Sequence, residues 1–163
     1  MRTEKTEINY GAYVAEYVER ARRAQAVISG YTQEQVDKLS AVIAYEMTRP
    51  NIEDELAKLA LEETELGDYP SKVGKVEKKV KGMFMEIKHE KTVGIVEEIP
   101  ERGIRRIKKP VGVIGALIPS TQPEMIPITT AMCTVKSRNA VIWPRIRAER
   151  KRHTIPSSSC GPC

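Results

Sequence analysis

The chain has 163 residues and a formal net charge of +5, and 40% of its residues are hydrophobic while 30% are charged. These proportions fit a soluble globular protein, and no apolar run approaches the roughly 20 residues that a membrane-spanning helix needs. The N-terminal segment MRTEKTEINY lacks the apolar core of a signal peptide. We therefore expect a cytoplasmic protein with no membrane partner.

The positive charge is concentrated near the C-terminus. In residues 144–163, five cations and one anion leave a net charge of +4, and the remainder of the chain is nearly neutral. A basic patch that belongs to a tail does not describe a folded groove, so nucleic acid is not the expected partner. Nucleic-acid binding through the tail alone stays open as one interpretation.

Two amphipathic helices are expected first along the chain. Apolar residues recur at three- and four-residue spacing over residues 9–29, and Gly30 ends that helix. Thr32 and Gln35 then form a capping box for a second helix, which ends before residue 50. Their apolar stripes are Tyr10, Tyr13, Val14, Tyr17, Val18, Ala21, Ala24 and Ile28 in the first helix, and Val36, Leu39, Ile43 and Met47 in the second.

Two further helices follow with the same periodicity. The third is expected over residues 51–66 and stops at Gly67, and Ser71 can cap a fourth that runs to about residue 88. Their inward residues are Ile52, Leu56, Leu59 and Ala60 in the third helix, and Val73, Val76, Val80, Phe84 and Ile87 in the fourth.

The fourth helix is rich in lysine. Its lysines are Lys72, Lys75, Lys78, Lys79 and Lys81. Glu77 and Glu86 interleave with them and no aromatic residue joins them, so a solvated helix face is favoured over an anion-binding surface. His89 has no second histidine or cysteine at ligand spacing, which predicts a surface residue and no metal site.

The hydrophobic period changes after this helix. Val93 and Ile95 alternate, a Pro-Glu-Arg-Gly turn follows at residues 100–103, and apolar residues return over residues 104–107. This pattern predicts a hairpin or a pair of short strands.

A continuous apolar run, VGVIGALI, then occupies residues 111–118. Runs without alternation are typical of a strand that is buried on both faces, so we expect a central parallel strand. The residues expected to be buried are Val111, Val113, Ile114 and Leu117. Gly112 and Gly115 do not form a Gly-x-Gly-x-x-Gly pattern, and we interpret them as allowing helices to pack closely on the sheet.

A polar turn follows the strand and leads into a helical segment. Its residues are Pro119, Ser120, Thr121, Gln122 and Pro123. In open α/β folds, ligands bind at this place, because loops at the carboxyl ends of strands meet free N–H groups at helix starts. The hydroxyls and N–H groups of the turn suit a cofactor phosphate, a ribose or an acyl oxyanion. A polar turn that binds no ligand is the alternative.

These residues also carry a family resemblance. KPVGVIGALIPSTQP at residues 109–123, a helix, and then SRNAVIW resemble the first strand, loop, helix and second strand of the cofactor domain in the aldehyde dehydrogenase superfamily. The proline-flanked Ser-Thr-Gln-Pro and the Arg-Asn-Ala at residues 138–140 resemble the CoA-acylating branch, and within it the sulfoacetaldehyde-type enzymes. The resemblance covers about residues 10–143 and only the N-terminal part of a much longer family member.

The resemblance implies an incomplete α/β fold. A helical N-terminal layer and a strand pair would precede the first β-α-β unit of a doubly wound, Rossmann-like cofactor domain. In the family, the strand pair lies outside the nucleotide core and supports oligomer contacts. Self-association through an exposed sheet edge is therefore expected. The domain would cover residues 1–143, and residues 144–163 would be a basic, disordered tail.

The implied function is that of an NAD(P)-dependent, CoA-acylating aldehyde dehydrogenase, which converts a small aldehyde, CoA and NAD(P)+ into an acyl-CoA and NAD(P)H. Ile118, Pro119, Ser120 and Thr121 would contact the cofactor, and Thr121 or the amide of Gln122 would help to hold the oxyanion. The acylating branch usually has Asn where this chain has Gln122. The added methylene moves the amide donor by about 1 Å, which puts the oxyanion role in question.

The nucleophile of the family is not found in this chain. The family's catalytic cysteine lies in a separate domain well downstream, so the chain by itself is expected not to catalyse. Cys133 lies in a predicted helix as a small apolar residue, and Cys160 and Cys163 belong to the tail. With three cysteines so placed, a reducing compartment is the simpler assumption. The terminal Cys-Gly-Pro-Cys lacks the following helix that activates the thioredoxin thiol.

The tail itself has a specific interpretation. The resemblance stops after Trp143, where acylating enzymes have a Pro-His-Pro-Arg turn, and permitted codons for residues 144–163 read two nucleotides later can encode that turn. We expect a shifted reading frame of a family gene. A different reading of the whole chain is a non-catalytic helical interaction module that binds a partner or a full-length dehydrogenase subunit.

Overall fold

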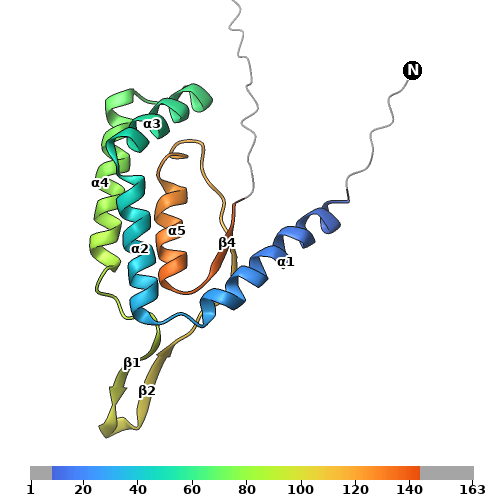
Figure 1. The fold of residues 1–163 in the computed structure, drawn as a ribbon, viewed down its shortest axis with the longest axis vertical. Coiled ribbons are helices and arrows are strands. Elements are labelled where there is room, and N and C mark those ends of the chain that lie inside the picture. The colour runs from blue at the N-terminus through green and yellow to red at the C-terminus, as the bar shows by residue number, and fades with distance from the viewer. Residues whose placement is uncertain (1–8, 144–163) are drawn as a thin grey trace, which may run out of the picture.

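The computed structural model describes residues 9–143, so the predicted tail and its Cys-Gly-Pro-Cys lie outside the described residues. Five α-helices, four strands and one 3-10 turn follow one another in the described part (Figure 1). They are α1 (Tyr10–Ser29), α2 (Gln33–Met47), α3 (Pro50–Thr64), α4 (Tyr69–Ile87), β1 (Gly94–Ile99), η1 (Pro100–Arg102), β2 (Ile104–Lys108), β3 (Val113–Gly115), α5 (Ile126–Lys136) and β4 (Ala140–Ile142). The order confirms the predicted helical layer, strand pair and single β-α-β unit.

Side-chain caps set the starts of α1, α2 and α4. The predicted capping box of α2 is present: the Gln35 N–H donates to Thr32 Oγ1 at 3.3 Å, and the Thr32 N–H donates to Gln35 Oε1 at 2.9 Å. The predicted cap of α4 is wrong, because Asp68 rather than Ser71 caps it. Asp68 Oδ1 accepts from the Ser71 N–H at 3.0 Å, so the helix begins three residues earlier, at Tyr69.

Replacing the α2 cap should have a measurable cost. Thr32→Ala should lower the free energy of unfolding by about 1 kcal/mol, because the Gln35 N–H loses its acceptor. Urea unfolding followed by circular dichroism measures the change. Thr32→Ser is the matched control, since serine keeps the accepting oxygen and should stay within a few tenths of a kcal/mol. Equal losses in the two variants would show that the cap is not what Thr32 contributes.

The core lies between α2, α4 and α5, which run side by side in Figure 1. Its buried residues are Ala44, Val76, Val80, Ile128 and Met132, and Ile43, Leu56, Met83, Phe84 and Ile87 pack around them. Helix α3 lies across the end of this layer and contacts α4. Its buried positions are Glu53, Ala57 and Ala60, and the prediction that Leu59 is buried is wrong. These three positions recur at four- and three-residue spacing and leave Leu59 on the outer side.

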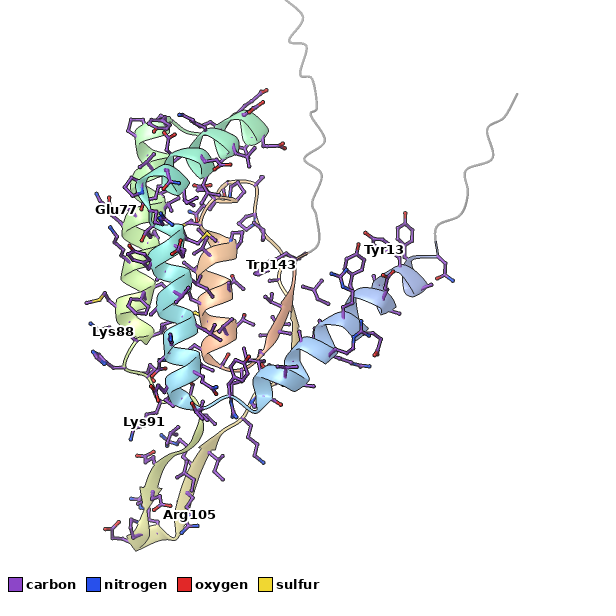
Figure 2. All side chains as sticks on the ribbon, viewed as in Figure 1. Tyr13, Glu77, Lys88, Lys91, Arg105 and Trp143 are labelled. Carbon is purple, nitrogen blue, oxygen red and sulfur yellow. The ribbon has the colours of Figure 1, made fainter. Side chains whose placement is uncertain are left out.

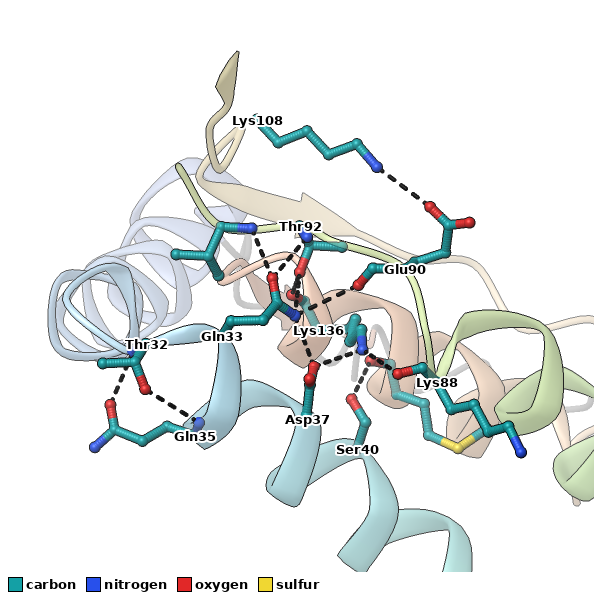
Figure 3. A network of polar contacts seen from close by, with 12 residues as sticks. Thr32, Gln33, Gln35, Asp37, Ser40, Lys88, Glu90, Thr92, Lys108 and Lys136 are labelled. Atoms are coloured by element: carbon teal, nitrogen blue, oxygen red, sulfur yellow. Dashed lines mark hydrogen bonds and ion pairs between the residues drawn. The ribbon is translucent and has the colours of Figure 1, made fainter. Parts of the chain in front are cut away.

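A polar network joins the ends of three helices beside the core (Figure 3). Gln33 Oε1 accepts from the N–H groups of Thr92 and Val93 at 2.8 and 3.0 Å, and Thr92 Oγ1 donates to the Lys136 carbonyl at 2.6 Å. The buried Lys136 ammonium in turn donates to Asp37 on α2 and to the carbonyl of Lys88, the C-cap residue of α4. The segment between α4 and β1 is thereby tied to both α2 and α5.

The strands β1 and β2 form the predicted hairpin. They pair antiparallel around η1, and Gly103 takes the left-handed conformation that the turn requires, with φ of 62°. The ribbon projects away from the helices (Figure 1), and all five residues of β2 are exposed. Its isoleucines at 95, 104 and 107 are about half exposed. The expected exposed edge is therefore present in this ribbon.

Helix α1 diverges from the three-helix layer and contacts β3 and β4 (Figure 1). Its first half carries exposed aromatic residues. Tyr13 lies far from the helical layer, while Trp143 lies beside α1 at the exit of β4 (Figure 2). Helix α1 is anchored at its other end, where the Arg138 guanidinium donates to the Ser29 carbonyl at 2.8 Å.

The second sheet consists of β3 and β4, which pair in parallel with Val113 opposite Ala140. The predicted central strand is shorter than expected, and its predicted burial is wrong at both ends: Val111 is 82% exposed and Leu117 is 76% exposed. Val113 and Ile114 are half-buried. The reason is that, within residues 9–143, β3 has β4 as its one strand neighbour, and a strand is buried on both faces only when its sheet is covered on both.

The two glycines of this run do not have the predicted packing role. A Cβ atom at Gly112 or at Gly115 would meet no other atom within 4 Å. Gly112 instead has φ of +113°, a conformation that disfavours any residue with a Cβ. Backbone conformation therefore accounts for Gly112, and nothing in the described part of the chain accounts for Gly115.

Candidate functional site

The candidate site is the loop that joins β3 to α5. It leaves the carboxyl end of β3, and β4 ends at the same edge because the two strands are parallel. The Gln122 N–H donates to the Pro119 carbonyl and the Ile126 N–H donates to the Gln122 carbonyl, each at 3.3 Å. The first bond closes a turn, and the second leads into the first turn of α5.

The five predicted site residues lie together in this loop. Pro119, Ser120 and Thr121 are exposed, whereas Ile118 and Gln122 are half-buried. Within the described residues, the backbone N–H groups of Ser120 and Thr121 have no hydrogen-bond partner in the protein. Two hydroxyls and two free N–H groups are thus available on one exposed turn. Such donors suit the phosphate or ribose oxygens of a dinucleotide.

A buried ion pair lies beneath the loop, and sequence reasoning missed it. The Lys72 ammonium lies 3.1 Å from Glu124 Oε2 and donates to the Thr121 carbonyl at 3.2 Å. The two side chains are 1% and 0% exposed, so the prediction that Lys72 shares a solvated face with the other lysines is wrong. The spacing carried a signal, because Lys72 lies four residues before Val76 and thus on the buried stripe of α4.

Asn139 holds the start of the β-α-β unit in register. Its Oδ1 accepts from the N–H groups of Val111 at 2.7 Å and Gly112 at 2.8 Å, and its Nδ2 donates to Ser137 Oγ at 2.8 Å. Arg138 before it has φ of 58°, which turns the chain from α5 into β4. The Arg-Asn-Ala segment therefore opens the second strand, as the sequence predicted.

The Cys133 thiol is exposed on α5, but its surroundings do not activate it as a nucleophile. Its Sγ lies 3.8 Å from Met83 Sδ, beside a shallow hollow of about 320 Å³ on the surface of α5. Desolvation, together with the charge of Glu86, raises the pKa of Cys133 above its ordinary value. A raised pKa disfavours the thiolate, which is the reactive form. Loop residues 118–122 do not line this hollow, nor the one of about 310 Å³ between α1 and β4.

Residues 9–143 contain neither a candidate metal site nor a candidate membrane-spanning helix. No group of three histidine, cysteine, aspartate or glutamate side chains in that range is arranged to hold a metal ion. None of the helices there is both long enough and apolar enough to cross a bilayer.

Known proteins match this chain at the sequence level. No model of a whole protein family matches it, but individual enzymes do. The acylating sulfoacetaldehyde dehydrogenase of Bilophila wadsworthia is 43% identical over 136 residues, which are 83% of this chain and 29% of that enzyme. The acetylating succinate-semialdehyde dehydrogenase of Clostridium kluyveri is 40% identical over 144 residues, which are 87% of this chain and 31% of that enzyme.

Solved structures match it as well. The acetylating aldehyde dehydrogenase of Geobacillus thermoglucosidasius superposes with a TM-score of 0.77 and 33% identity, over 81% of this chain and 29% of that one. A probable aldehyde dehydrogenase of Listeria monocytogenes gives a TM-score of 0.76 and 31% identity over the same shares. The chain thus spans about three tenths of the length of the relatives that it matches.

Proposed function

We propose that this chain, which corresponds to the N-terminal part of the CoA-acylating aldehyde dehydrogenases, supplies the cofactor-facing loop of an enzyme that converts a small aldehyde, CoA and NAD(P)+ into an acyl-CoA and NAD(P)H. One observation carries the proposal. The turn at residues 119–122 presents free donors at the carboxyl end of β3, directly before α5 and beside the parallel strand β4. This is the place where open α/β folds bind dinucleotides.

The residues of the loop would have two roles, contact with the cofactor and donation to the reacting carbonyl. The Ser120 and Thr121 hydroxyls and N–H groups would donate to phosphate or ribose oxygens, and Ile118 and Pro119 would offer an apolar edge to the nicotinamide ring. When bound, NAD(P)+ supplies the hydride acceptor for the oxidation. The Gln122 side-chain amide would donate to the oxygen of the reacting carbonyl. Gln122 is half-buried in the described structure.

Titration of the chain with NAD+ and NADP+, followed by ¹⁵N NMR, tests this proposal. We expect weak binding with a dissociation constant of about 1 mM, equivalent to about −4 kcal/mol, because only part of the site is present. The backbone amide signals of Ile118, Ser120, Thr121 and Gln122 should shift with ligand concentration. Thr121→Val should reduce the shifts severalfold, whereas Thr130→Val, a half-buried hydroxyl on α5, should not. Shifts confined to residues outside the loop, or none at all, would contradict the proposal.

A second function has one observation in its favour. Tyr10, Tyr13 and Val14 are exposed on α1, and this apolar surface suits a non-catalytic module that binds a protein partner such as a dehydrogenase subunit. Sedimentation of the chain with and without a full-length acylating relative tests it. A complex that Tyr13→Lys abolishes would support the module, and the absence of a complex at micromolar concentrations would exclude this partner.

A further inference from the structure

We propose that Lys72 and Glu124 are positioning residues for the candidate cofactor loop, holding the Thr121–Gln122 peptide in one orientation. This inference rests on the proposed function, because the loop is what the pair would position for the cofactor. It adds two residues outside the turn at residues 118–122 to the machinery of the site, and one of them lies on α4, 52 residues before its partner.

The pair is enclosed on every side that the structure describes. Lys72 lies in the first turn of α4 and Glu124 lies in the turn before α5. The preceding turn of the chain covers the lysine stem, since a Cβ atom on Gly67 would lie 3.7 Å from Lys72 Cε. Glu124 Oε1 is buried without a hydrogen-bond partner among the described residues, so the Lys72 ammonium is the group that compensates this carboxylate.

The contact with Thr121 gives the pair its effect on the loop. In a trans peptide, the carbonyl of Thr121 and the N–H of Gln122 point in opposite directions within one rigid plane. Lys72 holds the carbonyl at 3.2 Å, and the Pro119 carbonyl holds the N–H at 3.3 Å. The plane is therefore fixed at both ends. Its orientation sets the directions in which the Thr121 and Gln122 side chains leave the loop.

A purely structural role predicts something different. Buried ion pairs lose most of their attraction to desolvation, so two apolar residues of similar size often stabilise a fold equally well. Apolar residues cannot, however, donate to the Thr121 carbonyl. Global stability and local order of the loop can consequently be separated by comparing a single variant with a double variant.

The experiment uses Lys72→Met, the double variant Lys72→Met with Glu124→Met, and Lys79→Met as a control for an exposed lysine on the same helix. Urea unfolding measures stability, and hydrogen exchange measures protection of the Gln122 amide. Lys72→Met should unfold at lower urea concentration, and the double variant should recover most of that loss. In both, the Gln122 amide should exchange roughly tenfold faster than in the unmodified chain. Lys79→Met should change neither quantity.

The outcomes distinguish the two proposals. If the double variant is as stable as the unmodified chain and also regains its Gln122 protection, the pair only fills space and the inference is wrong. If Lys72→Met fails to fold, the double variant alone decides. Loss of NAD+ affinity by a similar factor in the double variant would support positioning for the cofactor. If the unmodified chain binds no NAD+, the proposed function fails, and the exchange data still test whether Lys72 orders the loop.

Discussion

Supplied with a short aldehyde, NAD+ and CoA, the purified chain should form no NADH above the background rate. Cys133 is the one cysteine within residues 9–143, and desolvation, with the charge of Glu86, raises its pKa, which disfavours the reactive thiolate. Removing an enzyme's nucleophile typically lowers kcat by a factor on the order of a million. Residues 9–143 thus contain no activated thiol, and the chain should be indistinguishable from buffer in a fluorescence assay for NADH.

Controls make this null result informative. A full-length acylating relative in the same assay shows that the substrates are competent. Cys133→Ser, combined with removal of residues 144–163, eliminates every thiol of the chain. CoA-dependent turnover that survives in this variant would overturn the prediction and would require a nucleophile that is not a cysteine.

Asn139→Ala should cause a large loss of stability, lowering the free energy of unfolding by about 2 kcal/mol. The substitution removes the one acceptor shared by the Val111 and Gly112 N–H groups, and each lost bond costs roughly 1 kcal/mol. These two bonds hold the segment that leads into β3 against the start of β4. Trp143, the single tryptophan of the chain, lies directly after β4 and reports the transition by its fluorescence in urea.

Asn139→Asp is the matched variant, because a carboxylate keeps the shared acceptor and loses the two Nδ2 donations to the Ser137 carbonyl and hydroxyl. It should retain most of the stability that Asn139→Ala loses. If the two variants unfold at the same urea concentration, the double acceptor is not what Asn139 contributes. Protection of the Gly112 amide against hydrogen exchange gives an independent measure, and it should fall only in the alanine variant.

Most locally encoded features could be predicted from the sequence, although the cap of α4 is Asp68 and not Ser71. The Thr32 capping box, the helix end at Gly30 and the turn at residues 100–103 each depend on residues within four positions of one another. Such features do not require knowledge of the tertiary fold. The loop at residues 118–122 could be located for a similar reason, because a polar turn between an apolar run and a helical segment is visible in the order of residues alone.

Burial could not be predicted in the same way. The apolar run at residues 111–118 indicates a strand covered on both faces, but Val111 and Leu117 are exposed in the described structure. An apolar run indicates that a strand is suited to having neighbours on both faces, but it does not show whether those neighbours are in the same chain. This chain spans about three tenths of the length of its relatives. The Lys72 contact was missed for the opposite reason. Lysine is rarely fully buried, so its residue type outweighed a helical spacing that placed it inward.

The way the core is divided along the chain has a consequence for biosynthesis. Helices α2, α4 and α5 are complete once residue 136 has left the ribosome, so their shared core can close early in translation. The side chains of Val111 and Leu117 are exposed to solvent at that stage, because the helical layer does not cover them. A nascent chain in this state offers chaperones an apolar strand attached to an already folded helical base. Misassociation during synthesis should accordingly begin at the sheet, while the helices stay native.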